Sequence, residues 1–279
     1  MTKSAPLKRS LLFIFGPPVL LSFLGVGLLV QSVSTASPTL EMVNEQISIN
    51  AAEGVAPPTP ALTDYIYPRL TIDSANQPLV VVNKLRALDP IDFAPPILTV
   101  MPSSESLDNS RELVLAPSAA NALVLMAEQM HAEGYGQLFV NSAYRTYDYQ
   151  VELFESKTRQ YGLAGALVRS AKAGHSEHQT GLAVDVSVPA QGCAIMTCFG
   201  ETVGGKWVAA NSWRFGFIVR YEEETIAITG YSYEPWHLRF VGEELANEYS
   251  ENGIHTLEEF WSLPAAEFYP EEVAESKID

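Results

Sequence analysis

The chain has 279 residues, of which 47% are hydrophobic and 10% aromatic, and its formal net charge is −16 at pH 7. This apolar content suffices for one substantial hydrophobic core, which excludes a disordered chain and a disulfide-stapled miniprotein. The negative charge repels phosphates, so we expect no nucleic-acid partner.

The N-terminus combines a basic tip with an uncharged run. Lys3, Lys8 and Arg9 precede residues 11–30, which carry no charge. A helix of this length can cross about 30 Å of hydrocarbon with its basic flank inside. We expect residues 1–34 to form an uncleaved membrane anchor. A cleaved signal peptide is the alternative, although its apolar region usually has only about 7 to 15 residues. Either way, the rest of the chain lies beyond the cytoplasmic membrane.

The remaining chain divides into a stalk, a domain and a tail. Residues 35–63 are rich in Ser, Thr, Ala and Pro and show no apolar periodicity, which predicts a flexible stalk. Residues 266–279 contain mainly acidic charges and are expected to form a solvated tail. The single folded domain is therefore expected over residues 64–265.

The first half of the domain mixes strand and helix patterns. The apolar, β-branched run at residues 79–83 predicts a strand. Apolar residues spaced by three and four predict a helix from Pro117 to Gly134. A short strand is expected over residues 138–140, followed by a helix that Asp148 caps and that ends near Gly162.

The second half predicts further strands. Residues 181–186 alternate, so Leu182, Val184 and Val186 share one face and Asp185 lies on the other. Two more strands are expected at residues 217–219 and 238–241, and a helix at 242–252. Because strands and helices do not alternate regularly, we predict an α+β fold, a mainly antiparallel sheet with flanking helices.

The only two cysteines, Cys193 and Cys198, lie in the glycine-rich segment 189–206. A local disulfide suits an oxidising compartment better than a pair of metal-binding thiolates. We expect this segment to form a loop at the rim of the site, where substrate choice can be set.

Two polar strings carry the candidate chemistry. The first contains His178 and Asp185, and the second contains Glu234 and His237. Two imidazoles, one carboxylate and an open fourth position match a catalytic zinc, whereas structural zinc sites are usually closed by four protein ligands. The spare carboxylate, Glu234, can move a proton from water to a leaving amine. The alternative is that both histidines are ordinary hydrogen-bonded residues and Asp185 caps a turn.

Four longer stretches support the catalytic interpretation. They read SAYRT at 142–146, with Gln150 after it, SEHQTGLAVD at 176–185, WRFGFIVRY at 213–221 and TGYSYEPWHLRFVG at 229–242. In order and wording they resemble the VanY-type D-alanyl-D-alanine carboxypeptidases, zinc peptidases related to lysostaphin and to the hedgehog domain. The resemblance implies one Zn²⁺ held by His178, Asp185 and His237, with Glu234 as the catalytic base.

The same resemblance implies a set of substrate contacts. Arg145 would hold a terminal carboxylate or the oxyanion that develops during attack, and a guanidinium suits both roles. Ser176 and Gln150 are implied as polar contacts to the peptide, with local caps or turn bonds as the alternative. Tyr233 and Trp236 either wall the cleft or pack beneath it.

We therefore expect a membrane-tethered zinc carboxypeptidase that removes the terminal D-alanine from peptidoglycan stem peptides or their precursors. An L,D-carboxypeptidase that trims tetrapeptide stems would use the same metal centre with a different subsite. A module that binds peptidoglycan without cutting it is an alternative of another class, and the presence of Glu234 beside three candidate ligands argues against it. The sequence leaves the oligomeric state open.

Overall fold

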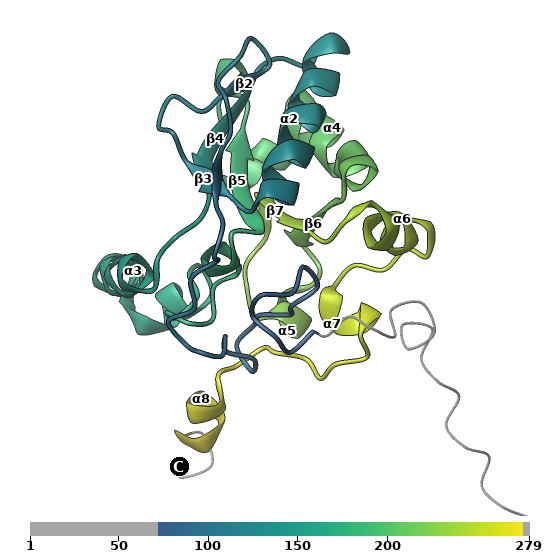
Figure 1. Cartoon of the computed structure of the whole chain (residues 1–279). Coiled ribbons are helices and arrows are strands. Elements are labelled where there is room, and N and C mark those ends of the chain that lie inside the picture. The colour runs from purple at the N-terminus through teal and green to yellow at the C-terminus, as the bar shows by residue number, and fades with distance from the viewer. Residues whose placement is uncertain (1–71, 276–279) are drawn as a thin grey trace, which may run out of the picture. The chain divides into compact units, whose positions relative to one another are not determined.

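The computed structural model describes residues 72–275, which Figure 1 shows around a central five-stranded sheet. The strand order is β2-β4-β5-β7-β6, where β2 and β4 are parallel and the other neighbours are antiparallel. The strands are β2 (Leu107–Asp108), β4 (Leu138–Ser142), β5 (Ala183–Ser187), β7 (Glu234–Phe240) and β6 (Phe217–Tyr221). The sheet is thus mixed, although mainly antiparallel as predicted. The predicted anchor and stalk lie outside the described residues.

Helices and short elements surround this sheet. A separate two-stranded sheet joins β1 (Thr99–Val100) to β3 (Val114–Leu115). The α-helices are α2 (Pro117–Ala132), α3 (Tyr147–Leu167), α4 (Val203–Asn211), α5 (Ile226–Thr229), α6 (Glu243–Glu251), α7 (Leu257–Phe260) and α8 (Pro270–Glu275). The 3₁₀ helices are η1 (Glu177–Thr180), η2 (Pro189–Gln191), η3 (Thr197–Glu201) and η4 (Ser212–Phe215). Within residues 72–275, no helix combines the length and apolar character needed to span a bilayer.

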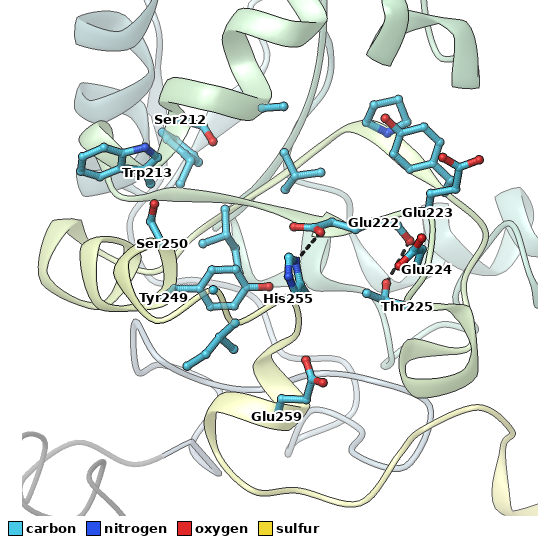
Figure 2. Close-up of a pocket in the computed structure, with 18 of the residues that line it drawn as sticks. Ser212, Trp213, Glu222, Glu223, Glu224, Thr225, Tyr249, Ser250, His255 and Glu259 are labelled. Atoms are coloured by element: carbon cyan, nitrogen blue, oxygen red, sulfur yellow. Dashed lines mark hydrogen bonds and ion pairs between the residues drawn. The ribbon is translucent and has the colours of Figure 1, made fainter.

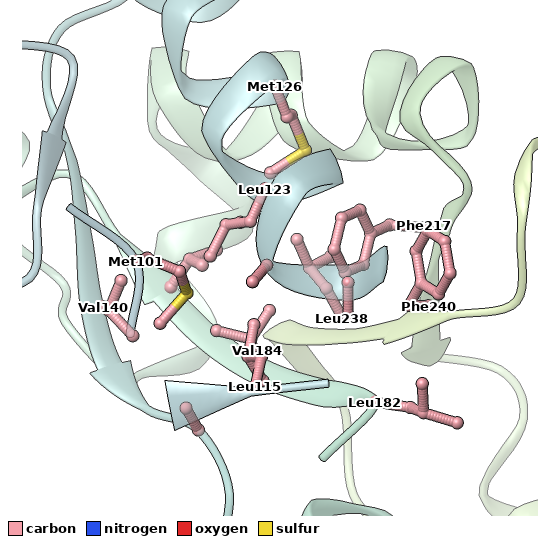
Figure 3. Close-up of a cluster of buried hydrophobic side chains, with 14 of the residues drawn as sticks. Met101, Leu115, Leu123, Met126, Val140, Leu182, Val184, Phe217, Leu238 and Phe240 are labelled. Carbon is pink, nitrogen blue, oxygen red and sulfur yellow. The ribbon is translucent and has the colours of Figure 1, made fainter. Parts of the chain in front are cut away.

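The core forms where α2 packs on the sheet. Leu123 and Met126 of α2 are buried in the same apolar cluster as Val184 of β5 and Leu238 of β7, as Figure 3 shows. Their helical spacing is the one that predicted α2 from the sequence. Full burial of each such side chain contributes roughly 1.5–3 kcal/mol, so this contact fixes the strands that carry the site.

The strand predicted at residues 79–83 does not form. Its side chains alternate between two buried apolar clusters, which accounts for the strand-like pattern. However, the carbonyl of Val80 accepts a hydrogen bond from Arg239 Nη2 at 2.7 Å, and that of Val81 accepts one from Arg86 Nε at 3.2 Å. Arginine side chains thus occupy positions that a neighbouring strand would need.

The helix predicted from Asp148 to Gly162 is longer than expected at both ends. Thr146 is the N-cap, because its hydroxyl accepts a hydrogen bond from the Tyr149 amide at 3.1 Å. Gly162 has φ 72°, a left-handed value that glycine adopts readily, and the chain resumes a helical course to Leu167. Gly162 therefore kinks α3 instead of ending it.

The predicted acidic tail is not solvated along its whole length. Ala266 and Tyr269 are buried, and the Tyr269 hydroxyl accepts a hydrogen bond from the Lys172 amide at 2.8 Å. The aromatic ring also lies 5.6 Å from Lys84 Nζ. An apolar ring inside an acidic segment therefore anchors that segment to the fold.

Candidate metal centre and substrate cleft

Three buried side chains, each from a different element, meet beside the sheet. Asp185 on β5 and His237 on β7 are direct cross-strand partners, and His178 lies in η1, shortly before β5. Asp185 Oδ1 lies 3.3 Å from His178 Nε2 and 3.2 Å from His237 Nδ1. One ligand atom from each residue falls within 4.8 Å of the others, so the three predicted ligands do come together.

The surroundings of Asp185 Oδ1 fit a cation. This oxygen is buried, and no donor among the described residues forms a hydrogen bond with it. Burial and the nearby Arg145 charge lower the pKa of His178 to about 4, so this ring is neutral at pH 7. Its Nδ1 donates to the Ala143 carbonyl at 2.7 Å, which leaves the Nε2 lone pair facing the aspartate. An oxygen and a nitrogen with no proton between them are ready to share a metal ion.

The second imidazole is oriented from behind by a carboxylate. His237 Nε2 lies 3.3 Å from Glu177 Oε2, which turns Nδ1 toward Asp185. Burial lowers the pKa of His237, but Asp185 and Glu177 outweigh burial and raise the pKa to about 9. The surroundings therefore favour a positive charge here, and a metal ion supplies one when it displaces the proton.

Glu234 reaches the site because β7 is irregular. Residues three apart in a regular strand face opposite sides. On β6 the paired residues Val219 and Tyr221 are two positions apart, whereas their partners on β7, Leu238 and Glu234, are four apart. The resulting bulge brings Glu234 Oε2 to 3.8 Å from His237 Nδ1. Burial raises the pKa of Glu234 to about 7, which suits proton transfer near neutral pH.

Arg145 is held beside the aspartate, and Gln150 lies behind it. Arg145 Nη2 donates to Asp185 Oδ2 at 2.8 Å, and its Nε donates to Ser142 Oγ at 2.9 Å. Gln150 is fully buried, with Oε1 accepting from Arg145 Nη1 at 3.5 Å and Nε2 donating to the Ala171 carbonyl at 2.8 Å. Because both ends of this amide form hydrogen bonds within the protein, Gln150 supports Arg145. It is not among the residues that line the cleft, although a contact to the peptide was expected.

A cavity of 510 Å³ contains the metal centre, and it is the candidate substrate cleft. Ser176, Tyr233 and Trp236, the other predicted contacts, line it. Part of its rim is residues 195–197, which belong to the loop that the Cys193–Cys198 disulfide closes. The structure therefore confirms the predicted disulfide and places its loop at the cleft.

Comparison with known proteins identifies the family. The family model described as "VanY: D-alanyl-D-alanine carboxypeptidase" matches residues 112–243, which include the three candidate ligands and Glu234. The putative carboxypeptidase YodJ of Bacillus subtilis is 38% identical over 192 residues, covering 68% of this chain and 69% of that protein. The chain belongs to the VanY family.

Solved structures support the same fold for this VanY-family chain. One shows the LdcB LD-carboxypeptidase and its peptidoglycan recognition; it is 38% identical, with a TM-score of 0.61, over 67% of this chain and 87% of that one. Another shows the vancomycin resistance D,D-pentapeptidase VanY from a VanB-type cassette, as a glutamate-to-alanine variant with Zn(II). It is 30% identical, with a TM-score of 0.55, over 65% of this chain and 97% of that one. The predicted α+β fold is confirmed.

A buried arginine–glutamate cluster supports the VanY-family metal centre, although the sequence patterns did not predict it. Glu177 Oε1 accepts from Arg220 Nε at 2.9 Å and from Arg239 Nη1 at 3.0 Å. Glu258 accepts two further bonds from Arg220, at 2.9 and 2.7 Å. A usable signal was present, because Arg220 and Arg239 interrupt apolar strands and a charge in such a place needs a buried partner.

A second cavity, of 730 Å³, is larger than the VanY-family cleft but contains none of the metal ligands. Figure 2 shows its acidic side chains, among them Glu222, Glu223 and Glu259, and His255 paired with Glu222 at 2.7 Å. Tyr249 Oη lacks a hydrogen-bond partner within residues 72–275. The chemistry is therefore located by converging ligand atoms and not by cavity volume.

Proposed function

We propose that the chain is a zinc-dependent D-alanyl-D-alanine carboxypeptidase that removes the terminal D-alanine from peptidoglycan stem peptides or their precursors. The observation that carries the proposal is Asp185 Oδ1, which accepts no hydrogen bond from the described residues and lies within 3.3 Å of two imidazole nitrogens. Two histidines, one carboxylate and an open position form the ligand set of a catalytic zinc. The family and the Zn(II) complex of the related D,D-pentapeptidase support this assignment.

The residues divide the reaction between them. His178, Asp185 and His237 would hold one Zn²⁺, which when bound acts as a Lewis acid toward water and the scissile carbonyl. Glu234 takes a proton from the attacking water and delivers it to the amine of the departing D-alanine, and its pKa near 7 permits both transfers. Arg145 lines the cleft and offers N–H donors to the terminal carboxylate or to the oxyanion.

The domain is also proposed to work outside the cytoplasmic membrane. The uncharged run at residues 11–30, after a basic tip, supports an anchor, with a cleaved signal peptide as the alternative. The Cys193–Cys198 disulfide supports an oxidising compartment. Fractionating cells that express the full chain, with N-terminal sequencing, tests this. An intact N-terminus in the membrane fraction is expected, a shortened secreted product indicates a signal peptide, and recovery in the cytosol contradicts both.

An L,D-carboxypeptidase is the second candidate, because a specific observation favours it. The LD-carboxypeptidase LdcB has a TM-score of 0.61 to this chain, compared with 0.55 for the D,D-pentapeptidase. Both activities break an amide beside a terminal D-alanine and need the same proton transfer. The two candidates therefore differ in how the cleft holds the residue before the cut.

Product analysis on two matched stems separates these candidates. Zinc-loaded protein is incubated with a pentapeptide stem and, separately, with the tetrapeptide that lacks its last D-alanine. Release of D-alanine from the pentapeptide alone is the expected result, and release from the tetrapeptide alone would support the L,D activity. Binding of both stems without cleavage would instead support a non-catalytic module. Prior chelation of the metal should abolish release and lower the melting temperature, since a ligand bound to the folded state stabilises it.

A further inference from the structure

The basic residues of the described part fall into two groups. Most pair with a carboxylate, and those without such an ion pair are Lys84, Arg111, Lys157 and Arg169. Lys84 is buried and donates to the carbonyls of Gly230 and Glu267, so its ammonium is satisfied by the fold. The other three all line the substrate cleft. We call Arg111, Lys157 and Arg169 the cationic rim.

Local contacts position the cationic rim without neutralising it. The ring centroid of Tyr161 lies 5.8 Å from Lys157 Nζ and 5.2 Å from the Arg169 guanidinium carbon, so one aromatic ring contacts both cations. Arg169 Nη1 donates to the Gly165 carbonyl at 3.0 Å, and Arg111 Nη1 donates to the Asn141 carbonyl at 2.7 Å. A ring and two carbonyls position these side chains, and neither kind of contact neutralises a positive charge.

None of the acidic residues that line the cleft forms an ion pair with the cationic rim. The acidic residues that line the cleft are Glu177, Asp185 and Glu234, all of which belong to the metal centre or its support. In a chain with a net charge of −16, three cations that line the cleft without an ion pair to a described carboxylate attract anions to it.

We propose that the cationic rim binds a second carboxylate of the stem peptide, one that lies on the N-terminal side of the cleaved bond. This inference rests on the proposed function and adds to it a substrate class, acidic stems as opposed to amidated ones. Arg145, which pairs with Asp185, is the receptor proposed above for the terminal carboxylate, so the two carboxylates have separate receptors. The second carboxylate belongs either to the γ-linked glutamate or to a diaminopimelate residue, and amidation removes either charge.

Four matched pentapeptide stems test the rim: one with both carboxylates free, one amidated at the glutamate, one amidated at the diaminopimelate, and one amidated at both. We expect kcat/KM for release of D-alanine to fall about tenfold on amidation, mainly through KM, because partly exposed ion pairs are of modest strength. The singly amidated stem that loses the activity identifies the bound carboxylate. The preference should shrink at high salt, where charges are screened.

Two protein variants connect the preference to the rim. The double variant Lys157→Gln, Arg169→Gln should lose the preference, so that it cuts the acidic stem as slowly as it cuts the amidated one. Arg159→Gln is the matched control, because Arg159 lies on α3 as Lys157 does, is exposed and pairs with Glu155 at 3.6 Å. It should keep the full preference for acidic stems.

Different outcomes overturn the rim and the proposed function. Equal cleavage of acidic and amidated stems by the wild-type protein, or an unchanged preference in the double variant, overturns the rim alone. If no stem releases D-alanine, the proposed function fails, and binding of the same stems to the Glu234→Gln variant still tests the rim. Tighter binding of acidic stems supports it, and equal binding contradicts it.

Discussion

Two buried ionic clusters lie side by side, with members on β5, β6, β7, η1 and α7, and they differ in one respect. In the arginine–glutamate cluster, both carboxylates accept hydrogen bonds from Arg220, so their negative charges are compensated within the protein. In the metal centre, Asp185 Oδ1 has no hydrogen bond within residues 72–275, although two imidazole nitrogens lie close to it. We call the arginine–glutamate cluster the closed cluster and the metal centre the open cluster. The closed cluster stabilises the fold, whereas the open cluster needs a ligand from outside the protein.

The two clusters are joined through Glu177. One of its oxygens accepts bonds from Arg220 and Arg239, and the other lies 3.3 Å from His237. The closed cluster thus holds the carboxylate that orients a ligand of the open one. Substitutions in the two clusters should therefore affect different measurable quantities.

The largest effect is expected in the open cluster. Glu234→Gln should lower kcat about 10²- to 10⁴-fold, because it removes the group that moves the proton. Zinc content and melting temperature should stay close to those of the wild type, since Glu234 is not one of the three ligands. Glu223→Gln, which changes an exposed acid of the other cavity, is the control. Loss of the metal from Glu234→Gln would show that this carboxylate is a ligand.

The closed cluster should respond in stability. Glu258→Gln removes the charge that faces Arg220 in a fully buried pair, and leaving one buried charge uncompensated costs about 3–5 kcal/mol of unfolding free energy. Chemical denaturation of the metal-free protein measures it, with Glu223→Gln again as the control. A variant as stable as the wild type would mean that water or another acid replaces Glu258.

A smaller effect is expected where the clusters meet. Glu177→Gln should weaken zinc binding about 10- to 100-fold, because the amide orients His237 less firmly than a carboxylate does. Competition with a chelator of known affinity measures the change. If the variant lost stability but bound zinc as tightly as the wild type, Glu177 would belong to the closed cluster alone.

Acid should act on the closed cluster with a defined sign. Burial raises the pKa of Glu258, but the charge of Arg220 outweighs burial and holds this pKa below its ordinary value. The unfolded value is about 4.3, so the stabilisation is complete above that pH and is lost as the pH falls through the folded pKa. The stability gap between wild type and Glu258→Gln should narrow from pH 7 to pH 3. A gap of constant size would contradict the assignment.

The sequence predicted the open cluster better than the closed one, for a physical reason. The residue types of His178, Asp185, Glu234 and His237 match a catalytic zinc site, and the resemblance of whole strings to the VanY family assigned each its role. The closed cluster joins Glu177 to Glu258 through Arg220, and no local pattern pairs residues so distant along the chain. The alternation over residues 181–186 correctly placed Asp185 opposite the core face.

Prediction failed where side chains replaced backbone partners. Residues 79–83 have the composition of a strand, but arginines from elsewhere occupy carbonyls of that segment. The family resemblance implied Gln150 as a polar contact to the peptide, yet both ends of its amide form hydrogen bonds within the protein. In each case the deciding partner lies outside the window in which the pattern was read.

The hydrogen bonds from Arg239 to the segment near residue 80 imply that an independently folding catalytic unit must include that segment. Arg239 Nη2 reaches the carbonyls of Pro78 and Val80, and Glu258 closes the other side of the cluster. Pro78, Val80 and Glu258 all lie outside the family match at residues 112–243. In a fragment trimmed to that match, Glu177 would be the only remaining carboxylate partner of Arg220 and Arg239 in this cluster. We therefore expect Glu177 to orient His237 less firmly in such a fragment.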